Sequence, residues 1–333
     1  MKIITEKDID GDPLGGRTIC VFGYGSQGEA QALNLRDSGA EVVVALPAGS
    51  RSRERAEREG FEVVDPGEGA RRADVCALLV PDEIMSDFVR ETVSPNIREG
   101  TALVFAHGFS LRFAEVDPPA YADVIVVAPM GPGLRLRERF MEGKGLPASF
   151  SVEQDATGTA RATALGYAKA IGCARVGLFE TTAAEETEVD LFAEQAVLCG
   201  GVTRLIEAGF DTLVEAGYSP ELAYMECLYE LDLTVSLIVR FGLSGLRKRI
   251  SGTALYGDLT RGDRIIGSET REAMREILRE IQDGTFARQM VSDERSGGKE
   301  LHGALSRERE KLIEETGRRL AAIAHPEAVP DSS

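Results

Sequence analysis

Two pairs of acidic residues in the C-terminal half of the chain have the spacing of metal ligands. Asp190 and Glu194 are four positions apart, as are Glu226 and Glu230, and apolar residues surround both pairs. On a helix this spacing places the two carboxylates on one face, with about 5–6 Å between Cβ atoms. We expect both faces to be at least partly buried, where paired carboxylates repel each other unless a cation neutralises them. Oxygen ligands of this kind suit Mg²⁺ or Mn²⁺.

The alternative is that these acids are ordinary solvated positions on helix surfaces. The chain carries a formal net charge of −17, so charged helix faces are expected without any metal. Two pairs with so few basic neighbours favour the metal site. With the nucleotide pattern described next, they indicate a divalent-metal-dependent oxidoreductase.

A glycine-rich segment near the N-terminus has the pattern of a dinucleotide-binding turn. The sequence Gly-Tyr-Gly-Ser-Gln-Gly at 23–28 directly follows an apolar run and precedes a helical stretch. In such a turn, Gly23 permits the tight bend, Gly25 lets the backbone approach the pyrophosphate, and Gly28 allows close packing of the helix. Glycines at this spacing are weak evidence alone, but the strand before, the helix after and a further strand downstream supply the required context.

The segment after the second predicted strand favours NADP as the cofactor. NAD-selective proteins place an acidic residue here to bind the ribose hydroxyls, but residues 46–53 read Leu-Pro-Ala-Gly-Ser-Arg-Ser-Arg. Ser50, Arg51 and Ser52 offer hydroxyl and cationic groups that suit a 2′-phosphate. The alternative is an ordinary surface loop in which Ser50 or Ser52 caps the following helix.

The order of apolar runs predicts an α/β N-terminal Rossmann domain with an all-α C-terminal domain. Short β-branched runs alternate with helical stretches from residue 17 to about 180, which is typical of a parallel sheet with crossover helices. The candidate strands are Thr18–Phe22, Glu41–Ala45, Val75–Val80, Ala102–Ala106, Val124–Ala128, Ser149–Val152 and Arg175–Leu178. Beyond Thr182 the sequence predicts helices, at roughly 184–198, 200–217, 219–240, 270–283 and 304–323.

These patterns predict the domain limits. We expect a dinucleotide-binding domain over 1–182, a helical domain over 183–325 and a disordered tail over 326–333.

Composition excludes several classes of function. The acidic balance argues against binding to nucleic acid, because no basic stripe of any length occurs. The N-terminus lacks an apolar export segment, and no apolar run is long enough to span a membrane. The five cysteines are scattered singly in apolar segments and are most simply reduced core residues. We therefore expect a cytoplasmic protein with a small-molecule substrate.

Longer motifs carry a resemblance to a known family. Besides the turn at 23–28, these are Ala-Leu-Asn-Leu-Arg-Asp-Ser-Gly at 32–39, Pro-Asp-Glu at 81–83, Phe-Ala-His-Gly-Phe at 105–109, Glu-Thr-Thr at 180–182, Asp-Leu-Phe at 190–192, Glu-Gln-Ala-Val-Leu-Cys-Gly-Gly at 194–201 and Glu-Ala-Gly-Tyr at 215–218. Over residues 1 to about 320 the chain resembles the class I ketol-acid reductoisomerases. Members of that family use NADPH and Mg²⁺ to shift an alkyl group of a 2-acetohydroxy acid. They then reduce the rearranged keto acid to a dihydroxy acid in branched-chain amino-acid biosynthesis.

The resemblance implies roles for particular residues. Asp190 and Glu194 would bind two Mg²⁺ ions, and Glu226 and Glu230 would come from the partner subunit of an interlocked helical homodimer or higher homo-oligomer. Further expected roles, implied by the matching motifs, are catalysis for His107 and Glu230, contact with the substrate carboxylate for Ser251, and cofactor binding for Gly23, Tyr24, Gly25, Ser26, Gln27, Gly28, Ser50, Arg51, Ser52, Pro81, Asp82 and Gly133. Without its motif, His107 would be interpreted as a hydrogen-bonded loop histidine.

The chain departs from the family pattern on the substrate side. Met130 stands where the family has a lysine, and Leu134 where it has a histidine. Further departures are Tyr229 for a histidine, Asp232 for a lysine, Ser236 for an aspartate, and Gly252 and Leu255 within the serine-led substrate motif. Three hypotheses remain open. The chain is a reductoisomerase, or a specialised reductase of a related 2-keto, 2-hydroxy-keto or imino acid without the alkyl shift, or a non-catalytic dimer that binds nucleotide or metal.

Overall fold

The computed structural model describes residues 2–113 and 116–324, which fall into two units. Unit 1 spans Met1–Val189 and unit 2 spans Asp190–Ser333. The boundary lies within helix α8 (Ala183–Ala193), slightly C-terminal to the expected limit at residue 182. The expected tail at 326–333 lies outside the described residues.

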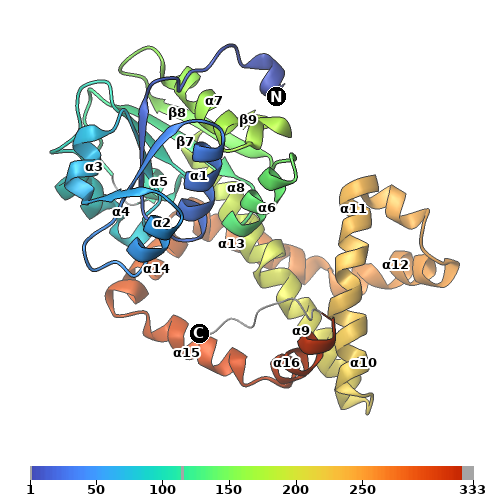
Figure 1. The fold of residues 1–333 in the computed structure, drawn as a ribbon. Helices are drawn as coiled ribbons and strands as arrows, with labels where there is room; N and C mark the ends of the chain where they lie inside the picture. The colour runs from blue at the N-terminus through green and yellow to red at the C-terminus, as the bar shows by residue number, and fades with distance from the viewer. Residues whose placement is uncertain (1, 114–115, 325–333) are drawn as a thin grey trace. The chain divides into compact units, whose positions relative to one another are not determined.

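Unit 1 is built on one nine-stranded sheet (Figure 1). Its order is β1-β9-β8-β7-β6-β5-β2-β3-β4. The strands are β1 (Ile3–Ile4), β2 (Thr18–Phe22), β3 (Glu41–Ala45), β4 (Glu62–Val64), β5 (Val75–Leu78), β6 (Ala102–Phe105), β7 (Asp123–Pro129), β8 (Ala148–Gln154) and β9 (Leu178–Glu180). Six predicted strands coincide closely with observed strands, whereas the seventh, Arg175–Leu178, shares only Leu178 with β9. The predicted fold class is confirmed. The very short β1 and β4 were not predicted, because a few residues show no measurable periodicity.

The expected parallel sheet contains antiparallel pairs at one side. Strands β2 to β7 pair in parallel, but β8 runs antiparallel to β7 and β1 runs antiparallel to β9. Residues 148–151 of β8 are all buried. Burial of consecutive residues, here including Ser149 and Ser151, indicates a strand covered on both faces, but it does not reveal the direction of the strand.

Helices cover both faces of the sheet and give unit 1 two apolar cores. One core contains buried residues of α1 (Ser26–Asp37), α6 (Gly133–Met141) and α7 (Ala160–Ala170). The other contains buried residues of α3 (Pro66–Arg72) and α4 (Asp82–Phe88). Strand β2 shows the alternation that divides them, with Ile19 and Val21 in the first core and Cys20 and Phe22 in the second. Each large apolar side chain buried in this way contributes about 1.5–3 kcal/mol.

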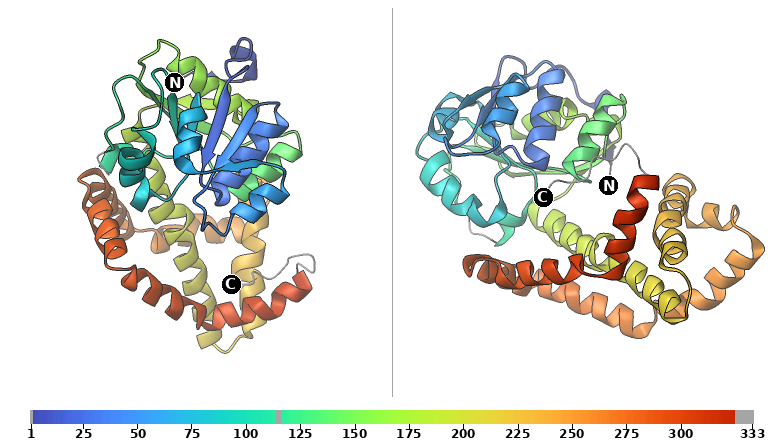
Figure 2. Two further views of the ribbon diagram at one scale, coloured as in Figure 1. Left: turned by 60° about the vertical axis from the view of Figure 1, so that its left-hand side comes forward. Right: turned by 60° about the horizontal axis from the view of Figure 1, so that its bottom comes forward.

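Unit 2 is helical (Figure 2). It has a small apolar core of its own. Its helices after α8 are α9 (Gly200–Glu215), α10 (Pro220–Tyr224), α11 (Glu230–Arg247), α12 (Gly252–Ile265), α13 (Ser268–Gln282), α14 (Thr285–Arg295), α15 (Lys299–Arg309) and α16 (Leu312–Ala324). The buried apolar residues at its centre are Phe210, Ala223 and Ile313. Helices α12 and α14 were not predicted. Within the described residues, every helix is too short or too polar to span a lipid bilayer.

Two π-helical segments interrupt the predicted helices of this unit. They span Glu194–Leu198 and Met225–Tyr229, so each includes one of the predicted metal ligands. A π-helical turn contains more residues than an α-helical turn and commonly occurs at functional sites. It also changes which side chains share a face. Two residues four positions apart across Met225–Tyr229, such as Glu226 and Glu230, are therefore not related as they would be in a regular α-helix.

Candidate functional site

The glycine-rich turn joins β2 to α1, and packing dictates two of its glycines. Gly23 has a φ of +96°, and a Cβ atom there would overlap the carbonyl oxygen of Leu79. A Cβ atom on Gly28 would overlap the carbonyl oxygen of Gly23. Gly25 is the N-cap of α1 and has open space where a side chain would begin. The turn therefore leaves its backbone accessible at Gly25, beside the unpaired N–H groups that a helix N-terminus offers to phosphates.

The remaining residues of the turn hold it in place. The Tyr24 side chain is buried and its hydroxyl group hydrogen-bonds Glu59, so Tyr24 offers a cofactor its backbone only. Gln27 Nε2 donates a hydrogen bond of 3.0 Å to the carbonyl oxygen of Gly131. A Cβ atom on Gly133 would overlap the backbone of Ser26, so the start of α6 packs directly on the start of α1.

The segment predicted to recognise the 2′-group precedes helix α2 (Arg53–Arg58). Arg51 is exposed, and Ser50 Oγ accepts a hydrogen bond of 3.3 Å from the backbone N–H of Ser52. Ser52 is the N-cap residue of α2, but its side chain makes no capping hydrogen bond. Arg53 turns back and donates to the carbonyl oxygens of Leu46 and Val63. Arg51 is thus the cation that this loop presents to solvent.

Two polar side chains follow neighbouring strands at the same edge of the sheet as the turn. Asp82 begins α4 just after β5, with Pro81 before it as the N-cap residue, and His107 follows β6. Ser110 Oγ donates a 3.1 Å hydrogen bond to Asp82. Burial raises the pKa of Asp82, and the neighbouring His107 and the Ser110 hydrogen bond partly oppose this rise. Ligands of open α/β sheets bind at this carboxyl edge.

Glu186 of α8 holds the loop that carries His107. Its Oε1 atom lies 3.0 Å from His107 Nδ1, and its Oε2 atom accepts a 2.7 Å hydrogen bond from the backbone N–H of Gly108. The Glu186 side chain is only 5% exposed. No motif in the sequence identified Glu186 as a site residue. A signal was present, because Glu186, Asp190 and Glu194 form a series of acids with a spacing of four.

His107, Glu186 and Asp190 form a candidate metal-binding group. Each offers one ligand atom, and these atoms lie within 4.8 Å of one another. Asp190 follows Glu186 by one turn of the same helix, α8. Among the described residues, no other set of three or more histidine, cysteine or acidic side chains meets this condition. Two carboxylates and an imidazole are donors that fit a divalent cation.

The other predicted metal ligands are placed differently from the expectation. Glu194, Glu226 and Glu230 are exposed in the single chain, so the expected burial of both acidic faces is wrong for these three residues. Among the apolar residues near them Ala196 is buried, whereas α11 has no buried residue along its described length. Glu226 and Glu230 are exposed to solvent in this chain, so burial alone does not require a cation beside them.

The predicted substrate-side residues lie at element ends. Ser251 is the N-cap of α12, and its hydroxyl oxygen accepts a 3.2 Å hydrogen bond from the backbone N–H of Ala254. Met130 follows β7 and is 50% exposed, while Leu134 in the first turn of α6 is 67% exposed. Because β7 is parallel to β6, Met130 lies at the carboxyl edge that carries His107.

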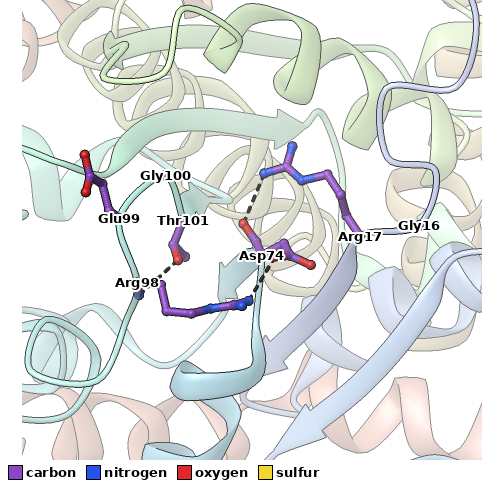
Figure 3. Close-up of a pocket in the computed structure, with 7 residues that line it drawn as sticks. All are labelled: Gly16, Arg17, Asp74, Arg98, Glu99, Gly100 and Thr101. Carbon is purple, nitrogen blue, oxygen red and sulfur yellow. Dashed lines mark hydrogen bonds and ion pairs between the residues drawn. The ribbon is translucent and has the colours of Figure 1, made fainter.

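A separate polar pocket of about 330 Å³ lies at the opposite edge of the sheet (Figure 3). It is formed where the chain enters β2, β5 and β6, and Asp74 links its two arginines. Arg17 donates to the Asp74 carbonyl oxygen, and Arg98 donates to the Asp74 carboxylate at 2.9 Å. Its charges are already balanced, because Asp74 and Glu99 accompany the two arginines. The pocket is therefore distinct from the candidate site at the carboxyl edge.

Comparisons with known proteins agree with a nucleotide-binding domain followed by a helical domain. Residues 13–177 match the model of the acetohydroxy acid isomeroreductase NADPH-binding domain, and residues 184–325 match that of the ketol-acid reductoisomerase C-terminal domain. A solved structure described as an NADH-preferring ketol-acid reductoisomerase from an uncultured archean is 39% identical, with a TM-score of 0.94. That alignment covers 97% of this chain and 99% of the relative.

More distant structures share the fold alone. A putative oxidoreductase from Jannaschia sp. CCS1 is 16% identical with a TM-score of 0.62, and the alignment covers 80% of this chain and 98% of the other. A semialdehyde dehydrogenase NAD-binding protein from Cupriavidus necator is 18% identical with a TM-score of 0.57, over 78% and 99% of the two chains. The two domain matches and the 39% identical structure, taken with the site described above, show that the chain belongs to the ketol-acid reductoisomerase family.

Proposed function

We propose that the chain is an NADPH- and Mg²⁺-dependent ketol-acid reductoisomerase that converts a 2-acetohydroxy acid into a 2,3-dihydroxy acid. The observation that carries the proposal is the group of His107, Glu186 and Asp190, whose histidine follows a strand at the carboxyl edge that holds the dinucleotide turn. The test is oxidation of NADPH by the purified protein with 2-acetolactate and Mg²⁺. If the protein binds NADPH but no 2-keto acid or 2-acetohydroxy acid causes NADPH oxidation, the chain would instead be the non-catalytic nucleotide-binding dimer.

The residues of the chain position one proton-transfer group. Glu186 accepts a hydrogen bond from Nδ1 of His107 and so orients the imidazole ring as a proton-transfer group. The Gly108 N–H bond to the same carboxylate fixes the direction of the Glu186 side chain. Bound Mg²⁺ would polarise the substrate oxygens, and a bound dinucleotide would supply the hydride.

The preference for NADPH is proposed from the loop before α2. The end of β3 carries no acid for the ribose hydroxyls, and the exposed Arg51 is free to meet a 2′-phosphate. The 39% identical relative is described as NADH-preferring, so the preference of this chain depends on its own loop residues. We retain the cytoplasm as the proposed compartment, where Cys20, Cys76 and Cys173, all buried and free, stay reduced.

A homodimer is proposed from the surface of α11. Leu233 and Val239 before the kink at Gly242, and Leu243 after it, are 58%, 82% and 60% exposed. Large exposed apolar side chains in one segment indicate a surface that another chain covers. A second copy placed there would bury them and bring its own Glu226 and Glu230 toward an active site. Sedimentation of the purified protein measures this directly, and a monomer at micromolar concentration would contradict it.

A second candidate function is supported by Met130 and Leu134. Both are large, exposed and apolar at the carboxyl edge, where the family resemblance leads us to expect a lysine and a histidine. A reductase that acts on a less oxygenated 2-keto acid, without the alkyl shift, would suit these side chains. Oxidation of NADPH with a simple 2-keto acid but not with 2-acetolactate would select this candidate.

A further inference from the structure

We infer that Arg55 is a positioning residue of the cofactor site that fastens the dinucleotide turn to helix α2. This helix directly follows the loop that contains Ser50, Arg51 and Ser52. The inference rests on the dinucleotide site of the family. It depends neither on the preference for NADPH nor on the isomerisation.

Arg55 makes three contacts with the turn and the helix that follows it. Its Nη2 atom donates a 2.6 Å hydrogen bond to the carbonyl oxygen of Tyr24, the second residue of the turn. The same atom lies 3.3 Å from a carboxylate oxygen of Glu29, in the first turn of α1. The guanidinium carbon lies 5.5 Å from the centre of the Tyr24 ring, which is within the range of a cation–π contact.

The other end of α2 holds Tyr24 as well. Glu59, the residue after this helix, accepts a hydrogen bond from the Tyr24 hydroxyl group. Burial, followed by the bond to Glu59, raises the pKa of Tyr24, so the hydroxyl keeps its proton and remains a donor. Phe61 packs edge-on against the Tyr24 ring, with 5.9 Å between the two ring centres. Tyr24 is therefore bound by Arg55 on its backbone and by Glu59 on its side chain.

The charge of Arg55 also has a role at this position. Glu29 lies in the first turn of α1, whose N-terminus is suited to bind the pyrophosphate. A carboxylate there would repel the phosphates, and Arg55 offsets that charge. The Nε–H group of Arg55 is buried and has no hydrogen-bond partner among the described residues. Since an unpaired buried donor is costly, the contacts made by Nη2 must outweigh that cost.

Helix α2 therefore connects the loop that precedes it, at residues 50–52, with the dinucleotide turn at residues 23–28. Arg53 ties the start of α2 to the carbonyl oxygens of Leu46 and Val63, and Arg55 ties it to the turn. A shift of α2 on binding the ribose end of the cofactor would be transmitted to the backbone that binds the pyrophosphate. Arg55 needs no contact with the cofactor to act in this way.

The test is the variant Arg55→Met, with dissociation constants for NADPH and NADH measured by nucleotide fluorescence. We expect both constants to rise by the same factor, about tenfold, because the turn serves both dinucleotides and one charge-assisted hydrogen bond is lost. The matched control is Arg58→Met on the same helix. Arg58 is exposed, and among the described residues it donates only to the carbonyl oxygen of Glu54, so its removal should change neither constant by more than about twofold.

A second variant separates positioning from direct binding. Adding Glu29→Gln to Arg55→Met should restore part of the affinity for both dinucleotides, because it removes the carboxylate that Arg55 offsets. A loss confined to NADPH would show that Arg55 binds the 2′-phosphate itself and would overturn the inference. Unchanged affinities in a folded Arg55→Met protein would overturn it too.

Folding is checked by thermal melting without cofactor. If Arg55→Met does not fold, Arg55→Lys replaces it in the same measurements, since lysine keeps the charge but loses the planar fork. The lysine variant should show a smaller, equal loss for both dinucleotides. Wild-type affinity in that variant, or a loss for one dinucleotide only, would contradict the inference.

Discussion

Nδ1 of His107 lies 3.0 Å from Oε1 of Glu186, although 79 positions separate the two residues in the chain. A carboxylate can only accept from Nδ1, whereas an amide can also donate to it and so favour the other ring tautomer. We predict that Glu186→Gln lowers kcat by about 10²-fold, the lower limit for loss of a positioned acid–base group. Steady-state kinetics with a melting curve measures this effect.

The control for this prediction is Glu185→Gln, one position away on α8. Glu185 is exposed, and its carboxylate accepts from the hydroxyl group of Thr181 rather than from His107. Its kcat should stay within about twofold of wild type, as for most surface substitutions. Equal losses in the two variants would show that Glu186 has no special relation to His107.

Arg51→Ala should remove the preference for NADPH. A charge-assisted bond to a 2′-phosphate contributes roughly 1.5–3 kcal/mol, so the affinity for NADPH should fall about tenfold or more while that for NADH holds. Both dissociation constants are measured by fluorescence in one buffer. Equal affinities of the wild type for NADPH and NADH would contradict the assignment of the loop.

Asp190→Asn should abolish Mg²⁺-dependent activity and leave the fold intact. Neutralising one ligand removes charge stabilisation at the metal but also relieves repulsion between Asp190 and Glu186, its neighbour one helical turn away. The melting temperature in EDTA should therefore hold or rise. Asp211→Asn, an exposed acid on α9, serves as the control and should keep full activity. Full wild-type activity in EDTA would refute the metal site.

The reduction half-reaction should be better preserved than the isomerisation. Met130 can neither donate a proton nor stabilise an oxyanion, and such groups are typically worth about 10²–10⁴ in rate. NADPH oxidation with 3-hydroxy-3-methyl-2-oxobutanoate should exceed that with 2-acetolactate, and Met130→Lys should narrow the gap. Met141→Lys on α6, also exposed, should not. Comparable rates of the wild type on both substrates would show that Met130 is a neutral substitution.

Asp82→Asn should stabilise the cofactor-free protein in a pH-dependent manner. Burial raises the folded-state pKa of Asp82, so ionising this carboxyl group costs stability. The cost is absent below the ordinary pKa of about 3.9 and grows as the pH rises toward the folded-state value. The gain in unfolding free energy should therefore be larger at about pH 6 than at about pH 4. Glu83 is exposed, so Glu83→Gln should show no such trend. A gain in unfolding free energy for Asp82→Asn that does not depend on pH would exclude this explanation.

The sequence by itself determined the fold class and the location of the dinucleotide turn. The alternation of β-branched runs and helices is a local pattern, and so is the spacing of Gly23, Gly25 and Gly28 between a strand and a helix. The structure keeps both features because they depend on contacts between residues close in sequence. For example, a Cβ atom on Gly28 would overlap the carbonyl oxygen of Gly23, five positions earlier.

Only the tertiary structure decided which side chains meet and which are covered. Glu186 reaches His107 because α8 packs beside the loop after β6, and Arg55 reaches Tyr24 because β3 and β2 are neighbours in the sheet. The exposure of Glu226 and Glu230 is likewise a tertiary property, since α11 has no buried residue along its described length. Local sequence sets periodicity and spacing, whereas contact and burial depend on strand order and packing between distant segments.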